Sequence, residues 1–561
     1  MTASVLIPPG LVLVIGGLLL PFLRGGLRSA VLVALPLVTL ALVWNVPDGA
    51  ALQAPFLGYD LILVEGDKLA RLFASVFAIM AFAGALFALN QARTTELAAA
   101  FVYAGSAIGV VFAGDLITLF ICWEVMAIGS TLVVWCGGPG ARSAGLRYAS
   151  IHLLGGVLLM AGIAGEIAAS GSIAFGKLDT STVPRWLMLA GFLINAGAPP
   201  LSAWLPDAYP ESSWSGMVFL SAFTTKAAVY VLLRGFPGTE LLIYVGLFMI
   251  FYGIVYAILE NDMRRILAYS IVNQVGFMVA GIGIGTEMAL NGAASHAFAH
   301  IVYKALLLMS AGSVLYMTGK RKCTDLGGLF RTMPLTAVCG IIGALSISSF
   351  PLTSGFISKS MISEAAASQH MEYVWYLLAA ASAGVFLHAG IKFPWFVFFQ
   401  KDSGLRPPDP PWNMRVAMML FAAICIGLGV APGVLYELLP YKVDYVPYTA
   451  SHVVSQLQLL LFSGLAFFLM LGFLKRTLTI TLDFDWFYRS FGRKLAIGLD
   501  ASAARVWQWL VAGVQGQARR INDRLHRHHG PEGTLGRTWP TGTMAFWTTV
   551  MLAAYLILSN L

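Results

Sequence analysis

Six ionisable residues lie inside apolar stretches of the sequence, where a charge is costly unless it faces a cavity or a partner. They are Glu124, Lys226, His296, His300, Lys304 and Lys359. Glu124 lies in the middle of segment 115–135, and Lys226 lies midway along segment 214–234. A lysine beside a carboxyl group favours its charged form, so a change in the distance between the two would move a proton. The pattern therefore predicts proton transfer, with a fixed structural ion pair as the alternative.

Three of these residues are spaced four apart in the run His296-Ala-Phe-Ala-His300-Ile-Val-Tyr-Lys304. This spacing places them on one face of a helix. Because histidine exchanges protons near neutral pH, the row is typical of a proton wire. Two histidines four residues apart could also bind zinc, but the run lacks the glutamate of an H-E-x-x-H pattern and no cysteine is placed to complete a site. We therefore expect no bound metal.

Beside Lys359, which is one of the six main candidates, the apolar segments contain the secondary candidates His152, His388 and Lys392. Lys359 follows an expected helix break at Ser349-Phe350-Pro351. Within a membrane, the unpaired backbone groups of a broken helix are tolerated only where they are buried in protein or line a water-filled cavity, so Lys359 is well placed to face a cavity. His388 and Lys392 lie one helical turn apart, but Lys392 is near a segment end, so its ammonium group could instead reach the membrane surface. His152 fits a water chain or an ordinary interhelical hydrogen bond equally well.

The composition indicates a membrane protein. Of 561 residues, 58% are hydrophobic and 11% are charged, whereas soluble chains carry about 25% charged residues. Five scattered cysteines form no C-x-x-C pair, which argues against a disulfide framework and an iron–sulfur site. The net charge of +8 lies mostly in short loops and near the C-terminus, where it marks membrane topology. We expect no cofactor, no catalytic or redox centre and no nucleic-acid partner.

About sixteen apolar segments are long enough to cross the roughly 30 Å hydrocarbon core as helices, which predicts an all-α polytopic membrane protein. Basic residues in alternate loops assign those loops to the cytoplasm, and the even number of spans places both termini outside. Segment 55–66 alternates in polarity and predicts a short external hairpin. The predicted spans are 4–23, 29–45, 67–90, 96–113, 115–135, 147–168, 186–204, 214–234, 240–259, 265–284, 288–317, 334–366, 372–399, 412–432, 450–474 and 542–560.

Two parts of the chain echo each other, with five predicted spans in each. The fourth span of 96–234 is interrupted at Ala198-Pro199-Pro200, and the fourth span of 240–400 is interrupted at Ser349-Phe350-Pro351. An odd number of spans makes the second part run in the opposite sense to the first. This arrangement predicts the two inverted repeats, each with a broken helix, that are typical of transporters.

The C-terminal part differs in kind from the rest. Segment 475–541 mixes apolar and basic residues at helical spacing, with Val506, Leu510 and Val514 on one side. It predicts an interfacial amphipathic helix that leads to a final span in 542–561, with a helix packed on cytoplasmic loops as the alternative. The remaining regions are N-terminal helices with the hairpin in 1–95 and peripheral helices in 412–474.

Several motifs in combination carry a family resemblance over roughly residues 60–430. They are Trp123-Glu124 within its span, P-P-L-x-A-W-L-P-D-A at 199–208, Arg264-Arg265-Ile-Leu-Ala-Tyr-Ser270, the H-x3-H-x3-K run and Gly355-Phe-Ile-Ser-Lys359. With these motifs the chain resembles the proton-translocating antiporter-like family. That family is shared by Mrp-type multisubunit cation/proton antiporters, membrane subunits of complex I and membrane-bound hydrogenases. Within it, the chain looks most like the D subunit of an Mrp-type antiporter.

The resemblance implies a role in proton transfer for each matching residue. Glu124 matches the family's fifth-helix glutamate, Lys226 its eighth-helix lysine and Lys359 its twelfth-helix lysine, while His296, His300 and Lys304 match its eleventh-helix relay. The chain departs from the family at Asn195, where a lysine ordinarily pairs with the glutamate, and at Ser202, which replaces a histidine. An amide cannot carry the charge that a switching pair needs. Either Lys226 pairs with Glu124 instead, or the first half-channel works differently.

The resemblance also implies a function. It favours a proton-translocating subunit of a multisubunit cation/proton antiporter, which would move protons along a mid-membrane chain of charged and polar residues. A proton-pumping membrane subunit of a complex I-like or hydrogenase redox complex is the alternative, and a structural or coupling subunit for uptake of another solute is a third. The implied partners are other membrane subunits, protons, a monovalent cation and the lipid bilayer, and the implied location is the inner membrane as a multi-pass protein.

Overall fold

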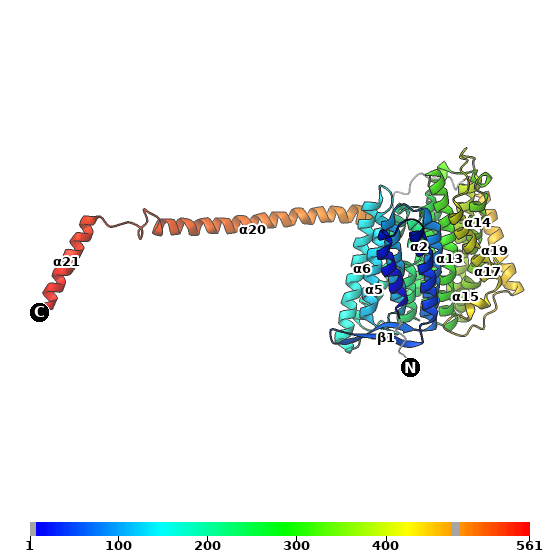
Figure 1. The fold of residues 1–561 in the computed structure, drawn as a ribbon, viewed down its shortest axis with the longest axis horizontal. Coiled ribbons are helices and arrows are strands. Elements are labelled where there is room, and N and C mark those ends of the chain that lie inside the picture. The colour runs from blue at the N-terminus through cyan, green and yellow to red at the C-terminus, as the bar shows by residue number, and fades with distance from the viewer. Residues whose placement is uncertain (1–6, 473–482, 484) are drawn as a thin grey trace. The chain divides into compact units, whose positions relative to one another are not determined.

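The structure, a computed structural model, describes residues 7–472, 483 and 485–561 and is mostly helical (Figure 1). It divides into two compact units, Met1–Asp485 and Trp486–Leu561. Among the described residues, thirteen helices are long and apolar enough to cross a membrane, and three shorter apolar helices accompany them. Each of the sixteen predicted spans overlaps one of these helices. The prediction of an all-α polytopic protein is therefore confirmed.

The described N-terminal half of the first unit contains ten α-helices. They are α1 (Pro9–Leu19), α2 (Gly25–Trp44), α3 (Lys68–Phe87), α4 (Thr94–Phe112), α5 (Leu116–Trp135), α6 (Ala141–Ser170), α7 (Val183–Ala196), α8 (Trp204–Ala208), α9 (Gly216–Leu220) and α10 (Thr224–Gly235). The rest of the unit contains α11 (Leu241–Leu259), α12 (Met263–Ile284), α13 (Glu287–Thr318), α14 (Pro334–Ile347), α15 (Ser354–Ser368), α16 (Glu372–Val385), α17 (Trp412–Val430), α18 (Gly433–Tyr436) and α19 (Ala450–Leu469). Two π-helical stretches, Phe386–Lys392 and Trp395–Phe399, extend α16.

Local sequence sets many of the helix ends. Side-chain oxygens of Asp67, Asp115, Asp262, Thr286 and Thr449 accept hydrogen bonds from the first free backbone N–H groups of α3, α5, α12, α13 and α19. Such N-caps satisfy donors that have no partner within the helix. At the other end, a glycine in the left-handed conformation follows α6, α7, α12 and α13. Because glycine adopts that conformation without steric cost, it terminates a helix readily.

The helices are interrupted at both predicted places and at one further place. Pro199 and Pro200 lie in the irregular segment between α7 and α8, and residues 348–353 separate α14 from α15. A third interruption, at Ser221–Phe223, separates α9 from α10 within the predicted span 214–234. This break contains neither proline nor glycine, so no residue in it signals an interruption. Whether 96–234 and 240–400 are inverted repeats stays a prediction.

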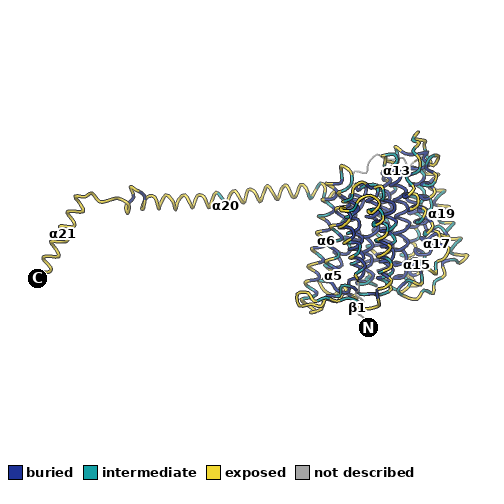
Figure 2. The backbone as a smooth tube through the Cα atoms, viewed as in Figure 1, coloured by how far each residue is buried: buried dark blue, intermediate teal, exposed yellow. Residues whose placement is uncertain are grey.

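Buried residues, dark blue in Figure 2, gather inside the first unit. The helices α9, α10, α12 and α13 are the most completely buried of its long apolar helices. The most apolar windows of Gly216–Gly235 and of α12 are completely buried, whereas only half of the corresponding window of α5 is buried. Lys226, His296, His300 and Lys304 lie in these helices with no exposed surface. Buried polar groups must find partners inside the protein, so the centre of the bundle is where functional polar contacts are expected.

A two-stranded antiparallel hairpin precedes α3. Its strands are β1 (Gly49–Phe56) and β2 (Tyr59–Gly66), so it begins before the predicted start at residue 55. Leu57 and Gly58 both have positive φ angles and form the two-residue turn. The side chain of Asp115 accepts a hydrogen bond of 2.7 Å from the backbone N–H of Ile62, which attaches the hairpin to the start of α5.

The second unit contains α20 (Gly492–His529) and α21 (Thr541–Ser559). No residue within either helix is buried. The predicted helix in the basic C-terminal segment is therefore present, and its position against a membrane surface or other loops stays a prediction. Residues 473–482 and 484, which include the basic pair Lys475 and Arg476 and the start of the predicted segment 475–541, lie outside the described residues.

Candidate functional site

Lys226 binds backbone oxygen at a helix break. Its Nζ atom donates hydrogen bonds to the carbonyl oxygen of Ser221, at 2.5 Å, and to Oγ1 of Thr225, at 3.1 Å. The carbonyl groups at the end of a helix lack partners within it and carry partial negative charge. The break between α9 and α10 therefore supplies the acceptor that a buried ammonium group needs.

Lys359 is held in the same way at a second break. Its Nζ atom donates to the carbonyl oxygen of Ile347, the last residue of α14, at 2.9 Å. The same ammonium group lies 4.8 Å from the centroid of the Phe277 ring, which adds a cation–π contact. Lys226 and Lys359, which are far apart in the sequence, are therefore bound in the same way. In each case a buried ammonium group donates to a backbone carbonyl oxygen at a helix break.

The three titratable residues of α13 lie between these lysines, in one buried row. His296 contacts Oγ of Ser358 through Nδ1 at 3.0 Å and Oε1 of Gln274 through Nε2 at 3.2 Å. Lys304 donates to Oγ of Ser270 at 2.7 Å. Neither ring nitrogen of His300 has a hydrogen-bond partner among the described residues. Buried polar groups of this kind are usually hydrogen-bonded to protein or to ordered water.

The three titratable residues of α13 also interact electrostatically with the two lysines, Lys226 and Lys359. Lys226 lies within electrostatic reach of His300, Lys304 and His296. Lys359 lies within reach of both histidines. The structure therefore brings together five of the six main candidates, from α10 through α13 to α15.

A cavity of about 760 Å³ reaches Lys359 from one side. Its lining includes Lys359, Glu364, Asp444, Tyr445, His452 and Gln456, which come from α15, α19 and the segment before α19. Ser349 Oγ, which also lines this cavity, is buried without a hydrogen-bond partner among the described residues. A cavity of this size that is lined in part by charged and hydroxyl side chains can hold water.

Glu124 is separate from this row. The described residues contain no ion pair between Glu124 and Lys226, because Lys226 is bound to Ser221 and Thr225 instead. The Glu124 carboxylate packs against Gly156 of α6. On α7, Oδ1 of Asn195 accepts a hydrogen bond of 2.8 Å from Nδ1 of His152. The sequence therefore located the acidic residue but not its neighbours.

The remaining secondary candidates lie in the π-helical stretch after α16. Lys392 Nζ donates to the carbonyl oxygens of Ala257, Ile258 and Glu260, at 3.1, 2.5 and 2.5 Å. These oxygens belong to the C-terminal end of α11, so the buried Lys392 side chain caps that helix. His388 contacts the carbonyl oxygen of Gly384 through Nδ1 at 2.8 Å.

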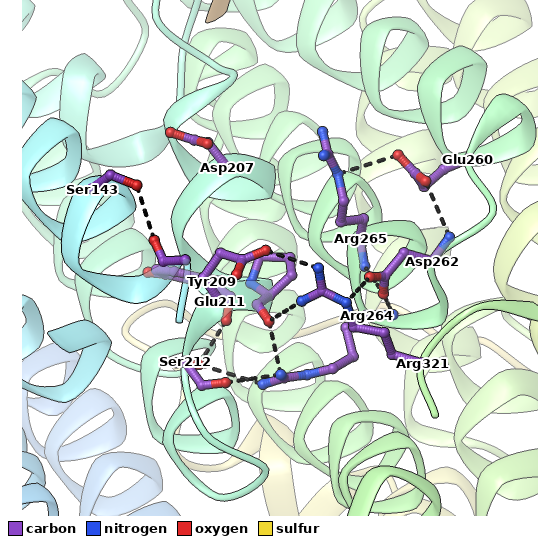
Figure 3. A network of polar contacts seen from close by, with 12 residues as sticks. Ser143, Asp207, Tyr209, Glu211, Ser212, Glu260, Asp262, Arg264, Arg265 and Arg321 are labelled. Carbon is purple, nitrogen blue, oxygen red and sulfur yellow. Dashed lines mark hydrogen bonds and ion pairs between the residues drawn. The ribbon is translucent and has the colours of Figure 1, made fainter. Parts of the chain in front are cut away.

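A network of ion pairs surrounds the start of α12 (Figure 3). Arg264 donates to the carbonyl oxygens of Pro210 and Ser212 at 2.8 and 2.9 Å. Arg321 forms ion pairs with Glu211 at 3.0 Å and with Asp262 at 2.9 Å. Burial raises the pKa of Asp262, while the neighbouring Arg321 and Arg264 oppose that rise. The network connects the loop after α8 to α12 through Arg264, while Arg265 pairs with Glu260 at 3.2 Å.

Sequence reasoning missed several partners of the row. Ser270, Ser358 and Tyr303 all contact its members, and Tyr303 donates to Gln274 at 3.0 Å. Ser270 and Ser358 fall within the quoted motifs. Small hydroxyl residues inside an apolar span were the available signal, because they are the usual hydrogen-bonding residues between membrane helices.

Comparison with known proteins agrees with this architecture. Residues 113–387 match the family described as NADH:quinone oxidoreductase/Mrp antiporter, transmembrane. The chain is 30% identical over 355 residues to the D subunit of a Na(+)/H(+) antiporter from Alkalihalophilus pseudofirmus, covering 59% of this chain and 71% of the relative. It is 29% identical over 437 residues to the A/B subunit of a probable K(+)/H(+) antiporter from Rhizobium meliloti, covering 71% of this chain but only 43% of that protein.

Among solved structures, the fold resembles that of a chain in the membrane-bound sulfane sulfur reductase, an archaeal respiratory membrane complex. The TM-score is 0.72 at 23% identity, and the alignment covers 99% of both chains. This likeness concerns the fold. Together with the sequence match to the Na(+)/H(+) antiporter relative, it leads to one conclusion: the chain is a multi-pass membrane protein that belongs to the NADH:quinone oxidoreductase/Mrp antiporter transmembrane family.

Proposed function

We propose that this chain is the proton-translocating subunit of a multisubunit cation/proton antiporter of the Mrp type. The observation that carries the proposal is the buried row that contains Lys226, Lys304, His300, His296 and Lys359. Its members hydrogen-bond only to neutral partners or to none among the described residues. A fixed ion pair would trap a proton, whereas groups on neutral partners can gain or lose one.

Protons would pass along this row one station at a time. A proton that arrives at one amine or imidazole repels the proton on the next group, so each transfer favours the following one. The break carbonyls at Ser221 and Ile347 hold the two end lysines when they are charged. Moving one charge across 100 mV corresponds to about 2.3 kcal/mol, which is a sufficient driving energy for transport. Glu124 would receive protons before the row.

Exchange for a cation is supported by the relatives. The two antiporter relatives carry names that specify exchange of Na(+) or K(+) for protons and that describe subunits. The partners of this chain would then be other membrane subunits, protons, a monovalent cation and the lipid bilayer. Which cation is exchanged would depend on those subunits as well.

A second candidate function is a proton-pumping subunit of a redox complex. It is supported by the fold correspondence to a chain of a respiratory membrane complex, which covers 99% of both chains. Purification of the intact complex separates the two candidates. Iron–sulfur or nickel-containing partners would support the redox complex, and small membrane-only partners would support the antiporter.

The proton-translocating role is tested in membrane vesicles that contain the assembled complex. Lys359→Ala and Glu124→Ala should each abolish proton uptake driven by an added cation gradient, measured with a pH-sensitive dye. Lys320→Ala removes an ammonium group from an exposed position after α13 and should leave uptake unchanged. Normal uptake in both of the first two variants would refute the proposal.

A further inference from the structure

Three buried polar atoms around one turn of α6 have no hydrogen-bond partner among the described residues. They are Oε1 of Glu124, Nε2 of His152 and Nδ2 of Asn195. An unsatisfied buried donor or acceptor costs about 1–3 kcal/mol. Three such atoms in one neighbourhood indicate a place for ordered water, which typically contacts two to four polar groups when it is buried.

The backbone of α6 explains why these groups come together. Gly155 and Gly156 are consecutive, and neither carries a side chain. The Glu124 carboxylate from α5 occupies the space that a side chain at Gly156 would fill, and Oδ1 of Asn195 from α7 lies 3.5 Å from the ideal Cβ position of Gly155. His152 lies one turn earlier on the same helix as Gly156. Positions four apart on a helix are neighbours, with about 5–6 Å between their Cβ positions, so one water molecule can span the distance between such groups.

The imidazole of His152 is fixed on its other sides. Its Nδ1 atom contacts Oδ1 of Asn195 at 2.8 Å, and its ring packs against Tyr148 and Trp204, with centroids 4.0 and 4.7 Å away. An amide oxygen accepts a hydrogen bond, so the contact assigns the proton of the neutral ring to Nδ1. Nε2 is then the open acceptor. The Nδ2 group of Asn195 remains as a donor to water.

Among the described residues, no lysine pairs with Glu124. Position 195 is an amide, and the ammonium group of Lys226 is bound at the α9–α10 break. On α6, the imidazole of His152 lies one turn before Gly156 and is 2% exposed. Because an imidazole ring nitrogen can accept and release a proton, it can perform the step that an amide cannot.

We propose that His152 is the proton-accepting partner of Glu124 in this chain, through water held between the carboxyl group, the imidazole and the Asn195 amide. The protonated carboxyl group of Glu124 gives its proton to the water, and the water gives one of its protons to Nε2 of His152. The products are a carboxylate and an imidazolium, with the water restored. Asn195 keeps the ring in place by accepting from Nδ1–H throughout. The inference rests on the proposed proton translocation and names its first transfer step.

The test compares variants of the assembled complex in native membrane vesicles. His152→Asn keeps a donor near the position of Nδ1, so it preserves the contact with Asn195 but cannot carry a proton. It should lower proton uptake at least tenfold at an unchanged amount of complex. Adding Asn195→Lys to that variant places an ammonium group beside Glu124 and should restore uptake to at least half of the wild-type rate. If His152→Asn does not assemble, His152→Gln, which places an amide near Nε2, is measured in its place.

Double variants show whether the two groups act in one step. The effects of substituting two residues that act in one step do not add. Glu124→Gln combined with His152→Asn should therefore lose no more uptake than Glu124→Gln alone. Wild-type uptake in His152→Asn, losses that multiply in the double variant, or no recovery with Asn195→Lys would each overturn the assignment. If Glu124→Gln abolishes uptake while His152→Asn does not, proton translocation stands and only this step fails. If Glu124→Gln also has wild-type uptake, the proposed function fails with it.

Discussion

Gly156→Ala tests whether the position of the Glu124 carboxylate matters for transport. An added methyl group at 156 meets that carboxylate well inside normal contact distance, so one of them must move. The far end of a glutamate side chain moves easily, and alanine favours a helix over glycine by about 0.5–1 kcal/mol. The variant should therefore fold and assemble as well as the wild type. Its effect should fall on proton transfer.

The size of that effect follows from the displacement. The carboxylate must shift by roughly 1 Å to reach ordinary contact distance, and a misplacement of that size at a reacting group can lower a rate about 100-fold. The assay is dye-monitored proton uptake in vesicles, normalised to the amount of assembled complex and accompanied by a thermal unfolding curve. We expect a loss of about 100-fold in rate with an unfolding midpoint equal to or above that of the wild type.

The adjacent glycine provides a matched control. A methyl group at Gly155 would lie 3.3 Å from Cγ2 of Ile194 and 3.5 Å from Oδ1 of Asn195, which requires adjustments of only a few tenths of an ångström. Gly155→Ala should therefore retain most of the uptake. Equal losses in the two variants would mean that α6 packing, and not the carboxylate, is responsible. Wild-type uptake in Gly156→Ala would refute the reasoning.

Three further variants test individual contacts. Lys392→Met removes the donor to three carbonyl oxygens at the end of α11. It should lower the free energy of unfolding by about 1.5–3 kcal/mol, measured as a lower thermal midpoint, and leave proton uptake per assembled complex unchanged. An unchanged midpoint would contradict the capping role. Asp115→Ala removes the N-cap of α5 and the contact to Ile62. It should lower the free energy of unfolding by about 0.5–2 kcal/mol and increase the rate of proteolysis within residues 49–66. Equal cleavage rates in the variant and the wild type would contradict the attachment of the hairpin by Asp115. Ser270→Ala leaves Lys304 without its hydroxyl acceptor and should lower uptake about tenfold, from a lost hydrogen bond of about 1.5 kcal/mol, whereas Ser270→Thr should not.

The local pattern of the sequence predicted much of the fold. Long apolar segments identify membrane helices because every backbone polar group must be satisfied within the helix. Prolines at 199, 200 and 351 indicated two of the helix breaks, because proline lacks a backbone N–H and clashes with the preceding helical turn. The spacing of His296, His300 and Lys304 likewise placed them on one face of α13, and the structure places them in one buried row. These features depend only on residues close together in the chain.

Tertiary structure alone decided the partners of the buried groups. The acceptor of Lys226 is a carbonyl oxygen exposed by the unexpected break at Ser221–Phe223, and that of Lys392 is the end of a helix more than 130 residues away. The sequence likewise could not show that Glu124 packs against Gly156, since that contact depends on how α5 lies against α6. Apolar spans predict that a segment is buried, but any of several neighbouring helices can bury it. Which polar atoms then meet is set by helix packing over the whole bundle, and that information is not local.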